Sequence, residues 1–317
     1  MGKGVGLVGC GRISRRQIEA IEATADVDIA VVCDIDEQRA RSTGEKLGVP
    51  WTTDYTTIRG VDVVSVMTPS GYHPRHASEI SETTDAPCVL CEKPVSLTVN
   101  EAVDLYDRVG AAGKRLLPVY QNRYNPLVQL VRTLIHDGSL GQIHQFNVNI
   151  FWNRNDDYFQ IDWHGTRELD GGVLYTQASH YVDMLLYLFG PVESAKGIGG
   201  RLRGLPVQDT VSAVIQHESG AVGSLNCTVS TFRKNYQTEF TIIGSAGTVR
   251  LEGTNLNTIS FWDVEGIEKP KMDFALDHIY GKGHNALYAY VAKEQWDKFP
   301  ARDEVLSGIE LMERLSF

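Results

Sequence analysis

Apolar and polar positions in the first 120 residues follow two alternating patterns. Short continuous apolar runs, typical of strands buried on both faces, are separated by segments with the helical spacing of apolar residues. The predicted strands are Val5–Val8, Val27–Cys33, Val61–Met67, a run beginning at Cys88, and Leu116–Tyr120. The predicted helices include a segment ending near Ala23, Glu37–Leu47 and Val99–Ala112, with Thr98 as an N-cap. This alternation predicts a parallel, doubly wound sheet.

Beyond about residue 125 the pattern changes. One helix, Leu127–His136, precedes a long alternating strand, Ile143–Trp152, and several strand-like runs follow between Glu193 and Trp262 with no helices between them. Strands joined by short turns predict an antiparallel sheet with one buried face. The fold class that we predict is therefore α/β, a Rossmann doubly wound parallel sheet plus a C-terminal α+β domain with an open, mostly antiparallel sheet. Residues 1–122 form the NAD-binding domain in this scheme. Residues 123–317 form the substrate and oligomerisation domain. The helical segment from about 284 packs either within this domain or back on the first domain.

Length and charge narrow the class of protein. A chain of 317 residues is enough for about two domains, and 42% hydrophobic with 22% charged residues is ordinary for a globular protein. The formal charge of −10 argues against nucleic-acid or anionic-membrane partners. No apolar run reaches the ~18 residues that span a bilayer, and the N-terminus lacks a signal-peptide layout, so we expect a cytoplasmic protein.

The cysteines give little indication of chemistry. They are Cys10, Cys33, Cys88, Cys91 and Cys227. Most lie inside apolar runs, and the single C-x-x-C has neither a second pair nor a nearby histidine cluster. We predict structural roles and no metal site, with a redox or metal role as the alternative.

A glycine turn joins the first strand to the first helix. Gly9 permits the turn, Gly11 lets the backbone approach a pyrophosphate, and Ser14 stands where the usual fingerprint has a third glycine. Asp34 ends the second strand, where a dinucleotide fold places the acid for the ribose hydroxyls. Its alternative role is a helix N-cap. Asp34 and Asp36 together would repel a 2′-phosphate, which favours NAD, although Arg39 keeps NADP open.

A lysine follows the strand at Cys88, in the sequence C-V-L-C-E-K-P-V. Pro94 prevents the ladder from continuing, and ligands of open α/β sheets bind outside the carboxyl ends of the strands. Lys93 is therefore expected beside the ligand, with a surface lysine at a strand end as the alternative. His73, which follows the strand Val61–Met67, either faces the same crevice or lies in a solvated loop.

A second group of polar residues lies on the helix that Asp170-Gly171-Gly172 opens and that runs to about Phe189. Thr176, His180, Asp183 and Tyr187 fall at i, i+4, i+7 and i+11, on one face of a regular helix. Burying unpaired polar groups costs ~1–3 kcal/mol each, so we expect this stripe to face a cleft. The alternative for His180 is a core histidine with satisfied hydrogen bonds.

Three motifs together carry a family resemblance: G-C-G-R-I-S at the N-terminus, E-K-P at 92–94, and G-G-x-x-x-x-x-x-H-x-x-D at 171–183. The chain resembles the Gfo/Idh/MocA oxidoreductases over essentially its whole length. The resemblance implies a Rossmann domain joined to an open sheet, with NAD(P) on the first domain and a sugar or cyclitol at the interface. Q-N-R-Y-N-P at 121–126, Trp152, W-H-G-T at 163–166 and G-G-V-L-Y-T-Q-A-S-H at 171–180 are similar to the WlbA/WbpB branch. Its members are tetrameric UDP-N-acetyl-2-amino-2-deoxyglucuronate 3-dehydrogenases.

The resemblance and the residue types together suggest roles. Histidine titrates near ~6.5 and suits a general base, while a lysine ammonium stabilises developing alkoxide charge, so Lys93 and His180 are the predicted catalytic residues. The family often has Asp where this chain has Thr176, which cannot act as a base. The predicted cofactor-binding residues are Gly9, Gly11, Arg12, Ile13, Asp34, Thr68, Pro69, His73, Glu92 and Gln121. The predicted substrate-binding residues are Lys93, Asn122, Arg123, Trp163, Thr166, Thr176, Gln177 and His180.

Some residues keep two interpretations. Asp183 either orients the imidazole of His180 or only pairs with a neighbour. Arg123 and Asn125 suit a carboxylate or diphosphate, Arg bidentately, or else support the turn and helix start at Pro126. Tyr158, Trp163 and Arg154 are looser candidates for a substrate loop.

The function that we expect is NAD-dependent oxidation of the C3 hydroxyl of a UDP-linked N-acetyl-hexuronic acid, in surface-polysaccharide sugar synthesis. The first alternative is a dehydrogenase of a free sugar or inositol, and the second a non-catalytic sensor of NAD or sugar. The expected partners are a small-molecule nucleotide sugar and further copies of the chain, as a homotetramer or homodimer, with no nucleic acid and no membrane.

Overall fold

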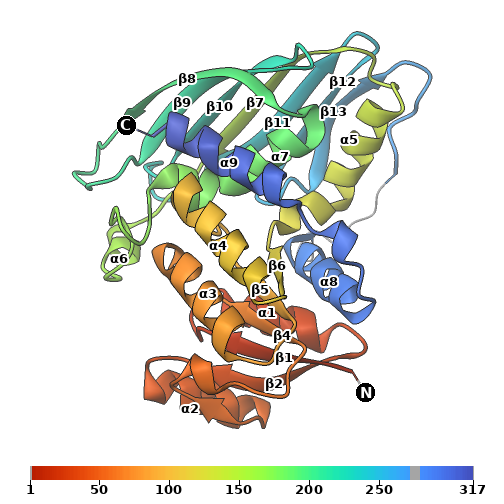
Figure 1. Ribbon diagram of the computed structural model, residues 1–317. Coiled ribbons are helices and arrows are strands. Elements are labelled where there is room, and N and C mark those ends of the chain that lie inside the picture. Colours follow the sequence, from red (N-terminus) through yellow and green to blue (C-terminus); the bar gives the residue numbers. More distant parts are fainter. Residues whose placement is uncertain (1, 272–278, 317) are drawn as a thin grey trace. The chain divides into compact units, whose positions relative to one another are not determined.

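The computed structural model describes residues 2–271 and 279–316, which divide into two compact units (Figure 1). The first unit contains the residues up to Gln121 together with Gly281–Leu306. The second contains the described residues from Asn122 to Tyr280 and those from Ser307 onward. In the described ranges, no helix is both long and apolar enough to cross a membrane.

The first unit contains a six-stranded parallel sheet in the order β3-β2-β1-β4-β5-β6 (Figure 1). The strands are β1 (Lys3–Val8), β2 (Val27–Cys33), β3 (Trp51–Thr52), β4 (Val63–Val66), β5 (Cys88–Cys91) and β6 (Arg115–Pro118). The order changes direction between β1 and β4, which is the switch point at which dinucleotides bind in such sheets. The predicted Rossmann sheet is confirmed.

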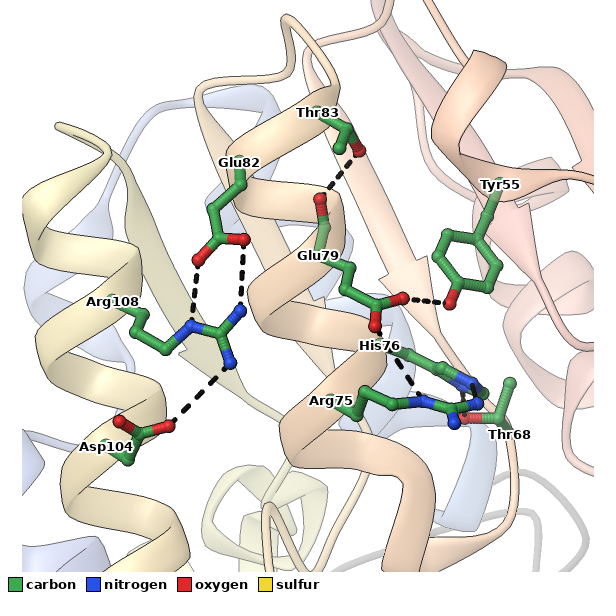
Figure 2. Close-up of polar contacts among 9 residues, drawn as sticks. All are labelled: Tyr55, Thr68, Arg75, His76, Glu79, Glu82, Thr83, Asp104 and Arg108. Carbon is green, nitrogen blue, oxygen red and sulfur yellow. Dashed lines mark hydrogen bonds and ion pairs between the residues drawn. The ribbon is translucent and has the colours of Figure 1, made fainter.

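Helices connect these strands. They are α1 (Ser14–Glu22), α2 (Glu37–Leu47), α3 (His73–Thr83) and α4 (Val99–Ala111), with short 3₁₀ turns at Tyr55–Thr57 and Ser70–Tyr72. Thr98 caps α4 as predicted, because its hydroxyl accepts the backbone N–H of Glu101 at 3.2 Å. The helices α3 and α4 lie side by side and are joined by a two-point ion pair between Arg108 and Glu82, at 2.8 and 3.0 Å (Figure 2).

Helix α8 (Ile279–Ala292) supplies part of the core of the first unit from the far end of the chain. Leu287, Tyr288 and Val291 are all fully buried. A 3₁₀ turn at Trp296–Lys298 follows, and α9 (Arg302–Arg314) is the last helix among the described residues. The core of the first unit therefore depends on residues that the chain supplies only after the second unit.

The second unit is built on a seven-stranded sheet in the order β13-β12-β11-β7-β10-β9-β8. The strands are β7 (Ile143–Phe151), β8 (Val192–Gly200), β9 (Thr210–His217), β10 (Val222–Thr228), β11 (Gln237–Gly244), β12 (Gly247–Glu252) and β13 (Thr258–Val264). Only the pair β7–β10 is parallel among these strands, and the other neighbours are antiparallel. The mostly antiparallel sheet is thus confirmed.

One face of this sheet is buried. Phe146, Val148 and Ile150 alternate with more exposed residues along β7, and the ring of Phe146 stacks on that of Phe189 at 4.9 Å. The helices of this unit are α5 (Pro126–His136), the short α6 (Asp156–Phe159) and α7 (Ser179–Phe189). Figure 1 shows α5 and α7 lying over the same face of the sheet.

The predicted regular helix from Gly172 to Phe189 is wrong in its first part. Leu174–Ala178 forms a π-helical turn, and α-helix begins only at Ser179. A π turn inserts one residue into the helical repeat, so the residues before it are rotated relative to those after it. The regular i, i+4, i+7, i+11 spacing assumed for the stripe therefore does not hold across this turn.

Candidate active site

The glycine turn after β1 has the geometry of a phosphate cradle. Gly9 has φ of +102°, and a Cβ there would meet the carbonyl oxygen of Met67 at 2.8 Å, so only glycine fits. At Gly11 a Cβ would meet no atom within 4 Å, which leaves open space on the side of the turn that a ligand would fill. No side chain caps the N-terminus of α1 at Ile13, so its backbone N–H groups are suited to an anion. Arg12 is exposed beside them.

Asp34 is fixed at the end of β2 by main-chain donors. One carboxylate oxygen accepts the N–H of Cys10 at 2.7 Å, and the other accepts that of Asp36 at 2.9 Å. Asp36 is the N-cap of α2, so the alternative of Asp34 as an N-cap is wrong. Each oxygen of Asp34 keeps a lone pair for a ribose hydroxyl. Arg39 pairs with Asp36 at 3.2 Å, which weakens the argument that it would hold a 2′-phosphate.

The end of β4 is held by two histidines of α3. His76 lies 3.0 Å from the hydroxyl of Thr68, and its other nitrogen lies 3.0 Å from the guanidinium of Arg75 (Figure 2). Because a guanidinium only donates, His76 must accept from Arg75 and donate to Thr68. Burial lowers the pKa of His76 to about 4, which keeps the ring neutral. The hydroxyl proton of Thr68 is then directed away from His76, as a donor suited to a ligand.

His73 is buried between the ends of β4 and β5, and its contact with the cofactor stays a prediction. Its side chain is 2% exposed, and its two ring nitrogens lie 2.7 Å from the carbonyl oxygens of Thr68 and Pro94. The ring thereby joins the ends of β4 and β5. Pro69 is half-buried beside Thr68, and Gln121, at the other edge of the sheet, is buried.

The E-K-P segment follows β5 directly. Lys93 is partly exposed, and the Lys93–Pro94 peptide bond is cis. The carboxylate of Glu92 is 5% exposed and accepts hydrogen bonds from Gln17 and from the backbone of Lys93. Glu92 therefore has buried partners inside the unit, and its contact with the cofactor stays a prediction.

In the second unit, His180 lies in the first turn of α7 and is 7% exposed. The turn before the helix is fixed by the carboxylate of Asp170, which accepts the N–H of Gly172 at 2.8 Å. Thr176 donates its hydroxyl to the carbonyl oxygen of Gly172 at 2.9 Å. Thr176 thus closes the π turn in the place where the family often carries an acid.

Most of the predicted polar stripe packs inside the second unit. Arg123 and Asp183 form a two-point ion pair at 2.8 and 2.7 Å, and both side chains are 4% exposed. Tyr187 accepts hydrogen bonds from Gln129 and Arg132 on α5. Asp183 and Tyr187 therefore have partners inside this unit instead of facing a cleft. Substrate binding by Arg123 stays a prediction.

Asn125 keeps its structural interpretation. Its side-chain oxygen accepts the N–H of Leu127 at 2.8 Å, which caps α5, and its amide donates to the carbonyl oxygen of Asn255 at 2.7 Å. Asn122, in the 3₁₀ turn Gln121–Tyr124, is partly exposed.

Arg154 is suited to bind a carboxylate or diphosphate, which is the role that the sequence predicted for Arg123. Its guanidinium lies over the rings of Trp152 at 5.0 Å and Tyr158 at 5.3 Å, and it donates to Gln177 at 2.7 Å. Gln177 is 5% exposed and three residues before His180, so it brings the Arg154 group close to the start of α7. A partly exposed guanidinium held by rings and an amide is suited to a planar anion.

The segment between α6 and the π turn is ordered by its own contacts. The ring of His164 stacks on Tyr158 at 3.9 Å and lies 3.8 Å from that of Trp163. The Thr166 hydroxyl donates to the carbonyl oxygen of Trp163 at 2.7 Å, so it closes this loop and is not presented to a ligand.

Residues that the sequence did not identify include Gln17, His76, His284 and Tyr288. His284 and Tyr288 are one turn apart in an apolar helix, which was the only available signal for them. Gln17, in α1, has no signal at all, because its partner Glu92 is 75 residues away.

The fold and these sites define an oxidoreductase of the dinucleotide-dependent class. Residues 3–120 match the model of the oxidoreductase family with an NAD-binding Rossmann fold, and residues 128–250 match that of the GFO/IDH/MocA C-terminal domain. The chain belongs to the Gfo/Idh/MocA oxidoreductase family, as an NAD-dependent dehydrogenase that acts on CH–OH groups. The predicted cofactor is confirmed.

Solved structures resemble the chain over nearly its whole length. The WlbA dehydrogenase from Bordetella pertussis, in complex with NADH and UDP-GlcNAcA, is 32% identical with a TM-score of 0.89, over 99% of this chain and 94% of that one. The WlbA enzyme from Chromobacterium violaceum, with the same ligands, is 35% identical with a TM-score of 0.88, over 99% and 92%. The inositol 2-dehydrogenase of Rhizobium meliloti is 23% identical over 90% of this chain and 87% of that protein.

Proposed function

We propose that this enzyme oxidises the C3 hydroxyl of a UDP-linked N-acetyl-hexuronic acid, in the synthesis of a surface polysaccharide. The observation that carries the proposal is the similarity, over 99% of the chain, to two WlbA dehydrogenases solved with NADH and UDP-GlcNAcA. The motifs on which the resemblance rests, G-C-G-R-I-S, E-K-P and the segment that ends in His180, are present in this chain.

In this proposal Lys93 and His180 are the catalytic residues for oxidation of the hydroxyl group. The ammonium of Lys93 stabilises negative charge on the oxygen, and the imidazole of His180 removes the proton. NAD, when bound, accepts the hydride that leaves the carbon. Asp34 and the cradle at Gly9 and Gly11 hold the cofactor.

The anionic groups of the proposed substrate require a cationic partner. Arg123 is neutralised by Asp183 inside the second unit, so we assign this role to Arg154, which Trp152 and Tyr158 hold in place. A bidentate guanidinium suits both the carboxylate of a hexuronic acid and a diphosphate.

A dehydrogenase of a free sugar or inositol is the second candidate, because the inositol enzyme of Rhizobium meliloti also aligns with most of the chain. Thr176 argues against it. Its hydroxyl closes the π turn by donating to Gly172, and it cannot replace a carboxylate that the family often has at this position.

Substrate oxidation tests both candidates directly. The purified enzyme and NAD are incubated with UDP-N-acetyl-glucuronate, with free inositols and with hexoses, and a product lighter by two hydrogens is sought by mass spectrometry. We expect this product only from the nucleotide sugar, and expect Lys93→Ala and His180→Ala to lose it while NAD still binds. Oxidation of inositol alone would refute the proposed substrate, and undiminished turnover by Lys93→Ala would refute the catalytic assignment.

We further propose that the enzyme works in the cytoplasm as a homotetramer or homodimer. The support for self-association is the outer face of the second sheet. It carries the exposed apolar residues Ile198, Val214 and Phe261 on strands β8, β9 and β13. Light scattering of the purified enzyme tests this, and a monomer at micromolar concentration would contradict it.

A further inference from the structure

A buried polar cluster lies behind the main chain of Lys93. The carboxylate of Glu92 accepts a hydrogen bond from the side chain of Gln17 at 2.7 Å and one from the backbone N–H of Lys93 at 3.2 Å. Gln17 is fully buried and belongs to α1, the helix that begins in the cofactor turn. Glu92 therefore connects the residue proposed to carry the reaction with the helix that the glycine turn begins.

Helix α8 adds two residues to this cluster. His284 Nε2 lies 3.8 Å from the carboxylate of Glu92, and the hydroxyl of Tyr288 donates to the side-chain oxygen of Gln17. His284 and Tyr288 are fully buried and one helical turn apart. A chain of polar contacts thus runs from Tyr288 through Gln17 to Glu92, and His284 meets it at the carboxylate.

The charges in this cluster are interdependent. Burial opposes ionisation of Glu92, but His284, then Gln17 and the charge of Lys93, lower its pKa below the ordinary value. His73 of α3, Cys91 of β5 and Tyr288 of α8 are the other titratable groups that feel this charge. A carboxylate kept ionised in the interior beside Lys93 favours the ammonium form of that lysine.

We infer that Glu92, Gln17 and His284 are positioning residues for Lys93, with Glu92 holding its main chain. This inference rests on the proposed role of Lys93. The reason for the arrangement is geometric, because a displacement of about 1 Å at a reacting group can cost about a hundredfold in rate. The cluster fixes Lys93 from three segments of the chain, namely α1, the end of β5 and α8.

The test uses the full-length enzyme and four variants. Glu92→Gln removes the charge, His284→Gln removes its partner, and Tyr288→Phe removes only the hydroxyl at the far end of the cluster. Glu294→Gln is the matched control, because Glu294 is an exposed carboxylate just beyond α8 that pairs with Lys3 at 2.6 Å. The measurements are kcat, KM and the pH dependence of Lys93 acylation, taken as the difference from Lys93→Ala.

We expect Glu92→Gln to lower kcat about tenfold or more while the KM for NAD stays within about twofold. Its Lys93 should react at lower pH, because the ammonium has lost its neighbouring negative charge. His284→Gln should lower kcat in the same way, Tyr288→Phe less, and Glu294→Gln should match the wild type.

Two results would overturn the inference. One is a folded Glu92→Gln enzyme with wild-type kcat and an unchanged acylation profile. The other, if that variant does not fold, is a His284→Gln enzyme with the same two properties. If the wild type oxidises no substrate, the proposed function fails, and the acylation profiles alone decide whether the cluster positions Lys93.

Discussion

At the scale of single residues, two buried carboxylates show how partners decide roles. Asp34 is held only by backbone N–H groups, which fix its direction and leave its negative charge for a ligand. Asp183 meets the guanidinium of Arg123 at two points, so its charge is neutralised within the second unit. We propose that the first is a binding group, whereas the second belongs to the framework of the second unit.

Replacing Asp34 tests the binding role. Asp34→Ala should raise the dissociation constant for NAD about tenfold to a hundredfold, since a charge-assisted hydrogen bond to a ribose hydroxyl contributes about 1.5–3 kcal/mol. The ratio of the dissociation constants for NADP and NAD should become smaller, because the carboxylate no longer repels a 2′-phosphate. Calorimetric titration measures both, and Glu45→Gln, an exposed change on α2, is the control. Unaltered NAD affinity in Asp34→Ala would rule out the ribose contact.

The framework role of Asp183 predicts a loss of stability. Asp183→Asn leaves the guanidinium of Arg123 buried without its charged partner and should lower the free energy of unfolding by about 3–5 kcal/mol. The double change Arg123→Met with Asp183→Leu removes both charges and should lose much less. Urea denaturation distinguishes these variants. If the single and double variants were equally unstable, the ion pair would not be the cause.

At the scale of elements, the turn before α7 places His180. Gly172 has φ of +93°, and a Cβ there would meet the carbonyl oxygen of Gln208 at 2.8 Å. Gly190, at the C-terminal end of the same helix, also has a positive φ of +81°, but a Cβ there would meet nothing within 4 Å. Comparing substitutions at the two glycines therefore distinguishes the effect of backbone strain alone from that of backbone strain combined with a steric clash.

Alanine substitution at both ends of the helix uses this contrast. Gly190→Ala should cost about 1–3 kcal/mol of stability from the backbone alone, because its φ of 81° and ψ of −161° lie in a region that is essentially restricted to glycine. Gly172→Ala should cost more, because Gln208 must also move, and it should lower kcat by displacing the start of α7. Denaturation curves and steady-state rates test this. Equal stability losses with an unchanged kcat in Gly172→Ala would contradict it.

At the scale of the whole molecule, buried neutral histidines determine how stability changes with pH. His217 is fully buried and donates to the carbonyl oxygen of Gly190 at 2.8 Å, and burial lowers its pKa. Burial also lowers the pKa of His76, to about 4. The unfolded chain therefore binds more protons than the native state below about pH 6.5, where free histidine titrates.

Stability should accordingly be fully present above pH 6.5 and fall on acidification. Each of these histidines contributes at most about 1.4 kcal/mol per pH unit until its native pKa is reached. Thermal unfolding between about pH 7.5 and 5 measures the slope, and His76→Gln should make it shallower. A slope that is unchanged in His76→Gln would show that folding does not lower the pKa of this ring.

The sequence by itself determined the elements and the cofactor turn. The spacing of apolar residues identified the strands and most of the helices, because burial on one or both faces imposes that spacing. Gly9 and Asp34 were found for a similar reason, since their neighbours along the chain carry the signal. The extra residue in the π turn was missed because its signature is not periodic.

Only the tertiary structure decided which polar residues are available for chemistry. Arg123, His73 and Glu92 were predicted from the sequence to bind ligands, and the structure adds that each has buried partners inside its unit. Asp183 lies 60 residues from Arg123, and His284 is supplied by a helix near the other end of the chain from Glu92. A buried charge or hydrogen-bonding group must be paired, but the local sequence does not show which distant residue is its partner. The identity of that partner distinguishes a binding residue from a structural one.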